Sequence, residues 1–369
     1  MNRRHFLATS TAAGLLMTKA AAQSSARYTA LALQTLCDAV NQDKSRNAAR
    51  KRMRAAVARV TSQIAASKGF LKSFNGYELK LVVLPEYWMT GFPLGETREE
   101  WQDKAVIEID GEFAGMISDV AKKFGTYLCS NHYENDPNFP DLYFQANVVF
   151  APSGEMILRY RRMISLYSPT PYDVWDAYLE KYGADAIFPV VETEIGVIGT
   201  IASEEILYPE IARMQTLKGA ELLLHPTSEV GAPDLTPKDI AKRARALENI
   251  AYVISANSAT IAGTPVPAAS TDGMSKIVDW KGKIAAEANQ GETMNANAVI
   301  DLESLRDARR KTGMSNFLSR LPMEAFRPGY AADLAPANRT PDGRMIERAD
   351  AIKGQQAVIN RLMQDGVIK

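Results

Sequence analysis

The chain has little of what most metal and cofactor sites require. It holds two cysteines and three histidines in 369 residues, so a zinc finger or a thiolate cluster is not expected. Its 43 basic and 43 acidic residues give zero formal net charge, which argues against nucleic acid or an anionic membrane surface as the main partner. The sequence contains no glycine-rich phosphate loop and no metal-ligand spacing, so neither a cofactor nor a metal is predicted.

No G-x-S-x-G motif occurs, so the sequence lacks this serine-hydrolase signature. A catalytic site of the α/β-hydrolase type is therefore excluded. The chain is 46% hydrophobic and 23% charged, enough for one large domain with a full core or for two smaller ones. Cys37 and Cys129 lie among apolar residues. They could pair in an oxidising compartment, but two buried thiols in separate elements are the simpler expectation.

Residues 1–22 are predicted to lie outside the fold. Arg3 and Arg4 precede a modest apolar run, which ends before alanines at 20–22. This order is typical of a twin-arginine export signal, and the run is too short to span a bilayer. A mitochondrial-type presequence or a chance basic start is the alternative. The interpretation predicts a mature chain that begins near Gln23 and is exported, already folded, to a bacterial periplasm or the medium.

The stretch from Gly196 to His225 predicts a strand, a sharp elbow, a helix and a second strand. The first strand is apolar and ends at residue 202, and the elbow is Ser203-Glu204-Glu205. A helix with Pro209 in its first turn follows, and apolar residues 222–224 form the next strand. Enzymes commonly hold a nucleophile at such an elbow. Ser203, at the tip, is therefore the candidate nucleophile.

A second candidate follows the apolar strand predicted at 79–84. Glu86 comes directly after this strand and Pro85, and Tyr87 and Trp88 follow it. A carboxylate that is poorly hydrated in such surroundings holds its proton more strongly, which suits a general base near neutrality. A helix-capping or salt-bridged glutamate is the alternative.

Five motifs resemble the carbon–nitrogen hydrolase (nitrilase) superfamily, and within it the aliphatic amidase and formamidase branch. They are L-P-E, Y-R-R, Y-P-E, K-G-A-E-L and R-A-L-E-N, in the family's order between residues 28 and 330. The resemblance implies a four-layer α-β-β-α sandwich at residues 23–330 and hydrolysis of non-peptide C–N bonds without a cofactor. It also implies a homodimer or larger homo-oligomer, with residues 331–369 as a C-terminal extension at a subunit interface.

The same resemblance assigns residues to the reaction, and at three of the assigned positions this sequence differs from the family pattern. The family's nucleophilic cysteine falls on Ser203, its catalytic lysine on Arg162, and the second glutamate of the amidase branch on Thr170. Arginine keeps the positive charge needed to stabilise an oxyanion but cannot give up a proton; a surface arginine is the alternative. Asp173 or Glu204 would have to replace the missing carboxylate.

Two hypotheses of function remain open. In the first, Ser203 attacks a small amide or ester, Glu86 is the base, and Arg162 stabilises the oxyanion. In the second, the protein is catalytically inactive and binds a small amide-like or carboxylate ligand. His225 follows a strand in the region where open sheets bind ligands, although a plain loop histidine is the alternative. The predicted substrate-binding residues are Tyr87, Trp88, Glu204 and His225.

Overall fold

The computed structural model describes residues 27–229, 235–268, 273–330, 334–340 and 348–369. The predicted export signal at 1–22 therefore lies outside the described residues. None of the helices in these ranges is both long enough and apolar enough to cross a membrane.

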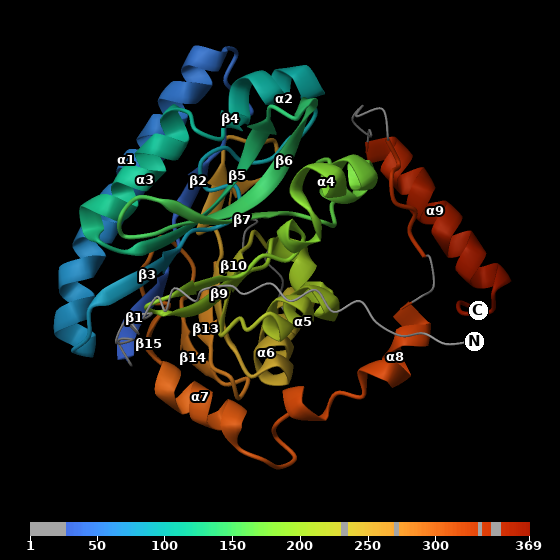
Figure 1. Ribbon diagram of the computed structural model, residues 1–369. Coiled ribbons are helices and arrows are strands. Elements are labelled where there is room, and N and C mark those ends of the chain that lie inside the picture. Colours follow the sequence, from blue (N-terminus) through green and yellow to red (C-terminus); the bar gives the residue numbers. More distant parts are fainter. Residues whose placement is uncertain (1–26, 230–234, 269–272, 331–333, 341–347) are drawn as a thin grey trace, which may run out of the picture.

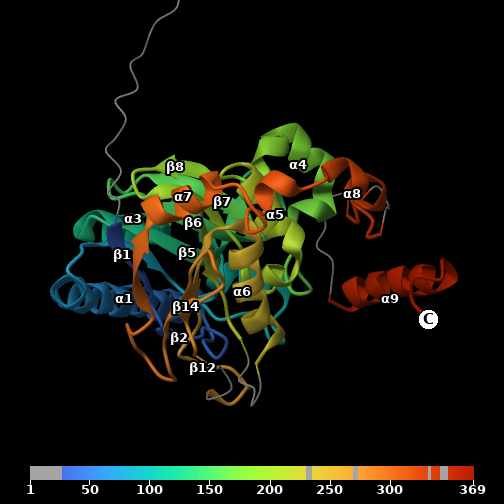
Figure 2. The same cartoon turned by 90° about the horizontal axis from the view of Figure 1, so that it is seen from below.

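Two sheets pack against each other through strands β1, β3 and β5 of one and β10 and β11 of the other (Figures 1 and 2). The first runs β15 (Asn297–Asp301), β1 (Arg27–Ala32), β3 (Leu79–Val83), β5 (Tyr127–Asp136), β6 (Phe139–Phe150) and β7 (Met156–Arg161), with β4 (Ile107–Glu108) also on β5. The second runs β14 (Ile284–Glu287), β13 (Lys276–Val278), β11 (Tyr252–Ala256), β10 (Leu222–Pro226), β9 (Gly196–Thr200) and β8 (Val191–Thr193). A separate pair joins β12 (Thr260–Ala262) to β2 (Leu36–Asp38).

Helices cover the outer faces of both sheets. The first sheet contacts α1 (Arg46–Asn75) and α3 (Glu112–Phe124), and α6 (Pro237–Asn249) contacts the second and packs beside α5 (Pro209–Leu217). The predicted four-layer α-β-β-α sandwich is confirmed. The remaining α-helices are α2 (Arg98–Ala105), α4 (Trp175–Tyr182), α7 (Leu302–Arg310), α8 (Met323–Tyr330) and α9 (Arg348–Gln364).

Successive side chains of the central strands point to opposite faces of the sheet, so the core has two parts. In β1, Tyr28, Ala30 and Ala32 belong to the cluster between the sheets. Leu31 and the adjacent Leu33 belong to the cluster that includes residues of α1 and α3. Both faces of such a strand are buried, which is why the sequence shows it as an almost continuous apolar run.

Strand β5 runs from Tyr127 to Asp136 and includes charged positions that an apolar strand pattern lacks. Arg161 on β7 compensates these charges, because its Nε lies 2.8 Å from Glu134 Oε1 and its Nη1 lies 2.5 Å from Asp136 Oδ2. A buried ion-pair network thus replaces the apolar pattern that strand prediction relies on.

The two thiols are free and buried, Cys37 on β2 and Cys129 on β5. Burial raises the pKa of both, so they behave as small apolar side chains. This confirms the simpler of the two expectations for the cysteines.

The C-terminal extension contacts its own chain around Asp173. Arg339 Nε donates to Asp173 Oδ1 at 2.7 Å, and Tyr172 Oη donates to the carbonyl of Ala335 at 3.0 Å. Helix α9 stands apart from the two sheets in both views (Figures 1 and 2). Its predicted place at a subunit interface stays a prediction.

Candidate active site

Ser203 stands at a strained elbow between β9 and the short 3₁₀ helix Ser203–Leu207. Its φ is 49°, in the left-handed region that a non-glycine residue occupies at a cost. His225 supports the elbow from the end of β10: its Nε2 lies 2.8 Å from the Ser203 carbonyl, and its Nδ1 lies 2.9 Å from Ser255 Oγ. Because a carbonyl only accepts, Nε2 is the protonated nitrogen.

His225 is uncharged in this position. Burial, helped by the nearby Lys242, lowers its pKa to about 3, and a neutral ring with Nε2 protonated uses Nδ1 to accept from Ser255. The ring is fully buried and does not line the cavity in front of Ser203. The structure therefore places His225 behind Ser203, away from the cavity, rather than in the predicted substrate contact.

A cavity of about 260 Å³ opens in front of Ser203. Its lining includes five of the residues predicted from the sequence, namely Glu86, Tyr87, Arg162, Ser203 and Glu204. Trp88 does not line it, since it is buried in the core with its indole N–H donating to Ser130 Oγ at 3.0 Å. The other lining residues are Phe92, Tyr167, Ser228, Lys238, Ile261, Thr264, Val266, Pro267 and Ala268.

Glu86 lies immediately beyond β3 and is 1% exposed. Its Oε1 accepts from Gln145 Nε2 at 2.8 Å and from Arg162 Nη1 at 3.1 Å, and its Oε2 accepts from the backbone N–H of Ser228 at 3.1 Å. These donors fix the orientation of the carboxylate. Ser203 is not among its hydrogen-bond partners in the described residues.

Arg162 follows β7 and is buried with most of its donors engaged. Nε donates to the carbonyl of Ile164 at 2.6 Å, Nη1 also donates to Gln145 Oε1 at 2.8 Å, and Nη2 pairs with Glu204. Burial works against the charge, but Tyr87 and the two glutamates Glu86 and Glu204 raise the pKa of Arg162 overall. The cation thus stays charged at the centre of the cavity wall.

Glu204, rather than Asp173, supplies a further carboxylate to the cavity. Asp173 is buried, and its Oδ2 accepts from the backbone N–H and the hydroxyl of Thr170 at 2.8 and 2.9 Å. Asp173 does not line the cavity, whereas Glu204 does. Of the two carboxylates expected to replace the missing glutamate, only Glu204 is placed to do so.

Lys238 is a site residue that the sequence interpretation missed. It lies in the first turn of α6, and its Nζ is 2.9 Å from Ser203 Oγ, 3.0 Å from the Ser228 carbonyl and 3.4 Å from Thr227 Oγ1. Burial lowers its pKa, although Glu86 and Glu229 act in the opposite direction. A lysine next to the positive end of a helix dipole is electrostatically unfavourable, and this was the signal available in the sequence.

Glu205, also missed, ties the elbow to the loop after β7. Its Oε1 accepts from the backbone N–H groups of Met163 and Ile164 at 2.7 and 3.1 Å, and its Oε2 accepts from Tyr160 Oη at 2.8 Å and from Ala202 N–H at 3.2 Å. Burial, partly offset by Arg162, raises the pKa of Glu205 to about 7.

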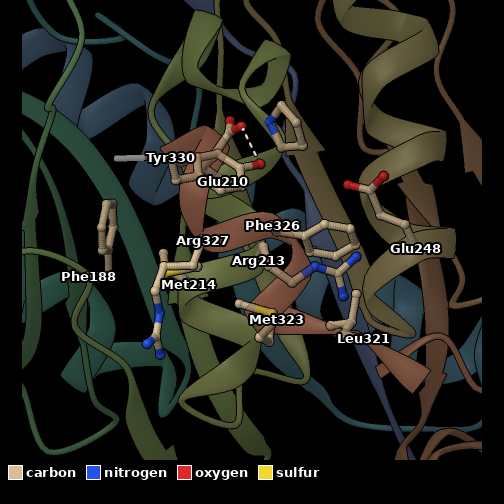
Figure 3. Close-up of a pocket in the computed structure, with 11 residues that line it drawn as sticks. Phe188, Glu210, Arg213, Met214, Glu248, Leu321, Met323, Phe326, Arg327 and Tyr330 are labelled. Atoms are coloured by element: carbon tan, nitrogen blue, oxygen red, sulfur yellow. Dashed lines mark hydrogen bonds between the residues drawn. The ribbon is translucent and has the colours of Figure 1, made fainter. Parts of the chain in front are cut away.

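A larger pocket of about 660 Å³ lies between α5 and α8 (Figure 3). Its wall is mostly apolar, and Tyr330 Oη donates to Glu210 at 3.0 Å beside it. The described lining residues include no serine, cysteine or lysine, so they offer no nucleophile paired with a base. The described part of the chain also has no group of three metal-ligating side chains. The Ser203 cavity, which a hydroxyl, a carboxylate and a guanidinium line together, is the candidate active site.

Comparisons with known proteins identify the same superfamily. The family model of the carbon-nitrogen hydrolases matches residues 48–310. A nitrilase of Pyrococcus abyssi is 30% identical over 65% of this chain and 83% of its own length, and an omega-amidase of Xenopus tropicalis is 29% identical over 63% and 80%. The crystal structure of a carbon-nitrogen hydrolase of Helicobacter pylori has a TM-score of 0.61, with 22% identity over 84% of this chain and all of that one.

Proposed function

Because the chain belongs to the carbon–nitrogen hydrolase family, we propose that it hydrolyses a small amide or ester through Ser203. The observation that carries the proposal is the strained Ser203 elbow, whose hydroxyl faces a cavity shared with a buried carboxylate and a buried guanidinium. Residues held in such backbone conformations cluster at active sites.

The proposed reaction passes through a covalent ester. Ser203 Oγ attacks the carbonyl carbon while a base removes its proton, and the leaving amine or alcohol departs protonated. Water then releases the acid and restores the hydroxyl. The charge of Arg162 and the backbone N–H of Glu204 stabilise the oxyanion. The sequence interpretation makes Glu86 the base.

The cavity supports a small substrate of low charge. Its volume of about 260 Å³ is slightly below the usual range of ligand pockets. Phe92, Tyr167, Ile261 and Val266 form an apolar part of its lining, whereas the charged groups gather around Ser203. This arrangement favours a short apolar acyl group with its amide or ester end at the serine. Relatives named as a nitrilase and an omega-amidase agree with this chemistry.

The second candidate, an inactive protein that binds an amide-like or carboxylate ligand, is favoured by one observation. The guanidinium of Arg162 already donates to Ile164, Gln145, Glu86 and Glu204, which leaves it little hydrogen-bonding capacity for an oxyanion. In that case a ligand would raise the melting temperature without being turned over.

Turnover by wild type and Ser203→Ala separates the two candidates. We expect the wild-type protein to hydrolyse short-chain amides or their p-nitrophenyl ester analogues, and Ser203→Ala to lose that activity. Turnover that persists in Ser203→Ala would rule out the proposed nucleophile. No turnover by the wild type, together with a ligand-induced rise in melting temperature, would favour the binding protein.

A further inference from the structure

We propose that Lys238, rather than Glu86, is the general base and acid that serves Ser203. The inference rests on the proposed function, and it replaces the base that the sequence interpretation assigns. Lys238 would be a catalytic residue in the strict sense, because its amine touches the atom that attacks the substrate.

The contacts of the amine favour a lone pair that faces Ser203. A neutral amine has two N–H donors and one lone pair. The Ser228 carbonyl can only accept, and the Thr227 hydroxyl is able to accept. When these two oxygens take the two N–H groups, the lone pair is left for the Ser203 hydroxyl 2.9 Å away. This distance is within the reach required of a general base.

Glu86 is oriented toward other partners. Both of its oxygens accept from Gln145, Arg162 or the Ser228 N–H, and the described structure gives it no hydrogen bond to Ser203. A buried carboxylate that is ion-paired with a guanidinium is instead suited to balancing charge. We therefore assign Glu86 a positioning role, holding Arg162 and the loop at Ser228.

The electrostatic surroundings are compatible with a neutral amine. Burial and the cations Arg162 and Lys242 lower the pKa of Lys238, and Glu86 and Glu229 oppose them. Glu229 is itself ion-paired with Lys242, which weakens its effect. The net result is a pKa below the ordinary lysine range, so a larger fraction of the amine is deprotonated at a given pH.

Lys238 carries the proton in each step of the proposed cycle. The neutral amine takes the proton of Ser203 Oγ as the O–C bond forms, and the carbonyl π electrons move to oxygen. The intermediate collapses, the leaving amine or alkoxide takes the proton from the Lys238 ammonium, and an ester to Ser203 remains. Water repeats the sequence with Lys238 as base, so one amide or ester and one water give an acid and an amine or alcohol.

Variants of Lys238 test the role through the pH profile of kcat/KM. We expect the wild-type profile to rise as Lys238 loses its proton, and Lys238→Met and Lys238→Arg to lose about 10²–10⁴-fold in kcat/KM, the usual contribution of general base catalysis. Small primary amines should partly restore Lys238→Ala. Arg243→Met, which removes a cation from the exposed side of the same helix, is the matched control and should keep the wild-type profile.

Glu86→Gln distinguishes the two candidate bases. Removing the negative charge near Lys238 should lower the pKa of that amine further, so the rising limb of the profile should move to lower pH and persist. If Glu86 is the base, Glu86→Gln should abolish turnover and Lys238→Met should retain it. That result would overturn the proposal.

Labelling by a serine-directed fluorophosphonate separates failure of this inference from failure of the proposed function. If wild type labels at Ser203 much faster than Lys238→Met but turns over no amide or ester, Lys238 activates Ser203 and the hydrolysis proposal fails. If both label at the same rate, the role of Lys238 is refuted even where hydrolysis is observed. Circular dichroism of each variant shows whether a loss reflects unfolding, and amine rescue of Lys238→Ala would exclude that explanation.

Discussion

Replacement of Glu205 by glutamine should change how the stability of the protein depends on pH. Glu205 is fully buried, and its pKa is raised from 4.5 to about 7, mainly by burial. An acid with a higher pKa in the folded state binds its proton more tightly there. The associated stability is therefore fully present below the pKa of the unfolded carboxyl and is lost as the pH rises through about 7.

The magnitude follows from the two pKa values. A difference of this size corresponds to about 3 kcal/mol, and most of it, about 2.5 kcal/mol, is lost between about pH 5 and about pH 8. His225 also titrates differently in the folded and unfolded states, and its lowered pKa makes stability fall toward acid pH. Its contribution is present in both proteins and cancels when the two are compared.

The assay is equilibrium unfolding in denaturant over this pH range, with wild type and Glu205→Gln side by side. Glutamine places an NH₂ group near the Ala202 N–H or against two other N–H donors, so it should destabilise the protein by an amount that does not depend on pH. The free energy of unfolding of the wild type should fall by about 2.5 kcal/mol relative to the variant as pH rises. A constant difference would mean that Glu205 stays ionised and that Arg162 outweighs burial.

Two further substitutions follow from the site. Ser203→Cys should raise the rate of ammonia release from short amides, because a thiol ionises far more readily than a hydroxyl and Lys238 lies beside it; an inactive variant with wild-type stability would show that the rest of the site does not support amide hydrolysis. Asp173→Asn should lower the free energy of unfolding by roughly 1–3 kcal/mol, since it weakens the hydrogen bond from the Thr170 hydroxyl and the ion pair with Arg339, and should leave kcat/KM unchanged. Asp176→Asn, an exposed neighbour, is its control, and an equal effect from both would contradict the buried role of Asp173.

The sequence predicted the fold and the charged and hydroxyl groups at the centre of the proposed chemistry, because those features depend on local patterns. Apolar strands followed by an acidic residue or an elbow placed Glu86 and Ser203 at strand ends, and the resemblance added Arg162. Glu86 and Arg162 follow strands of the first sheet and Ser203 follows a strand of the second, and the packing of the two sheets brings all three to one cavity. The β6–β7 hairpin also depends on a local pattern, since its strands pair across the turn at residues 151–155.

Features that depend on pairing between distant segments were missed. Strand β5 carries the buried Glu134 and Asp136, whose charges are compensated by Arg161 on β7. In the sequence, Lys238 is one of several basic residues on a charged helix. Only the fold shows that the start of α6 lies beside Ser203. Trp88 and His225 have side chains of the kind that often contact ligands. Trp88 lies in a turn and His225 on β10, and both side chains are buried in the interior.

The most direct test of the account is the intact mass of the protein during turnover of an activated ester, followed by peptide mapping. We predict an acyl group attached to the peptide that contains Ser203, in wild type but not in Ser203→Ala. An acyl group on another residue, or steady turnover with no trapped adduct after rapid acid quench, would contradict the claim that Ser203 is the nucleophile.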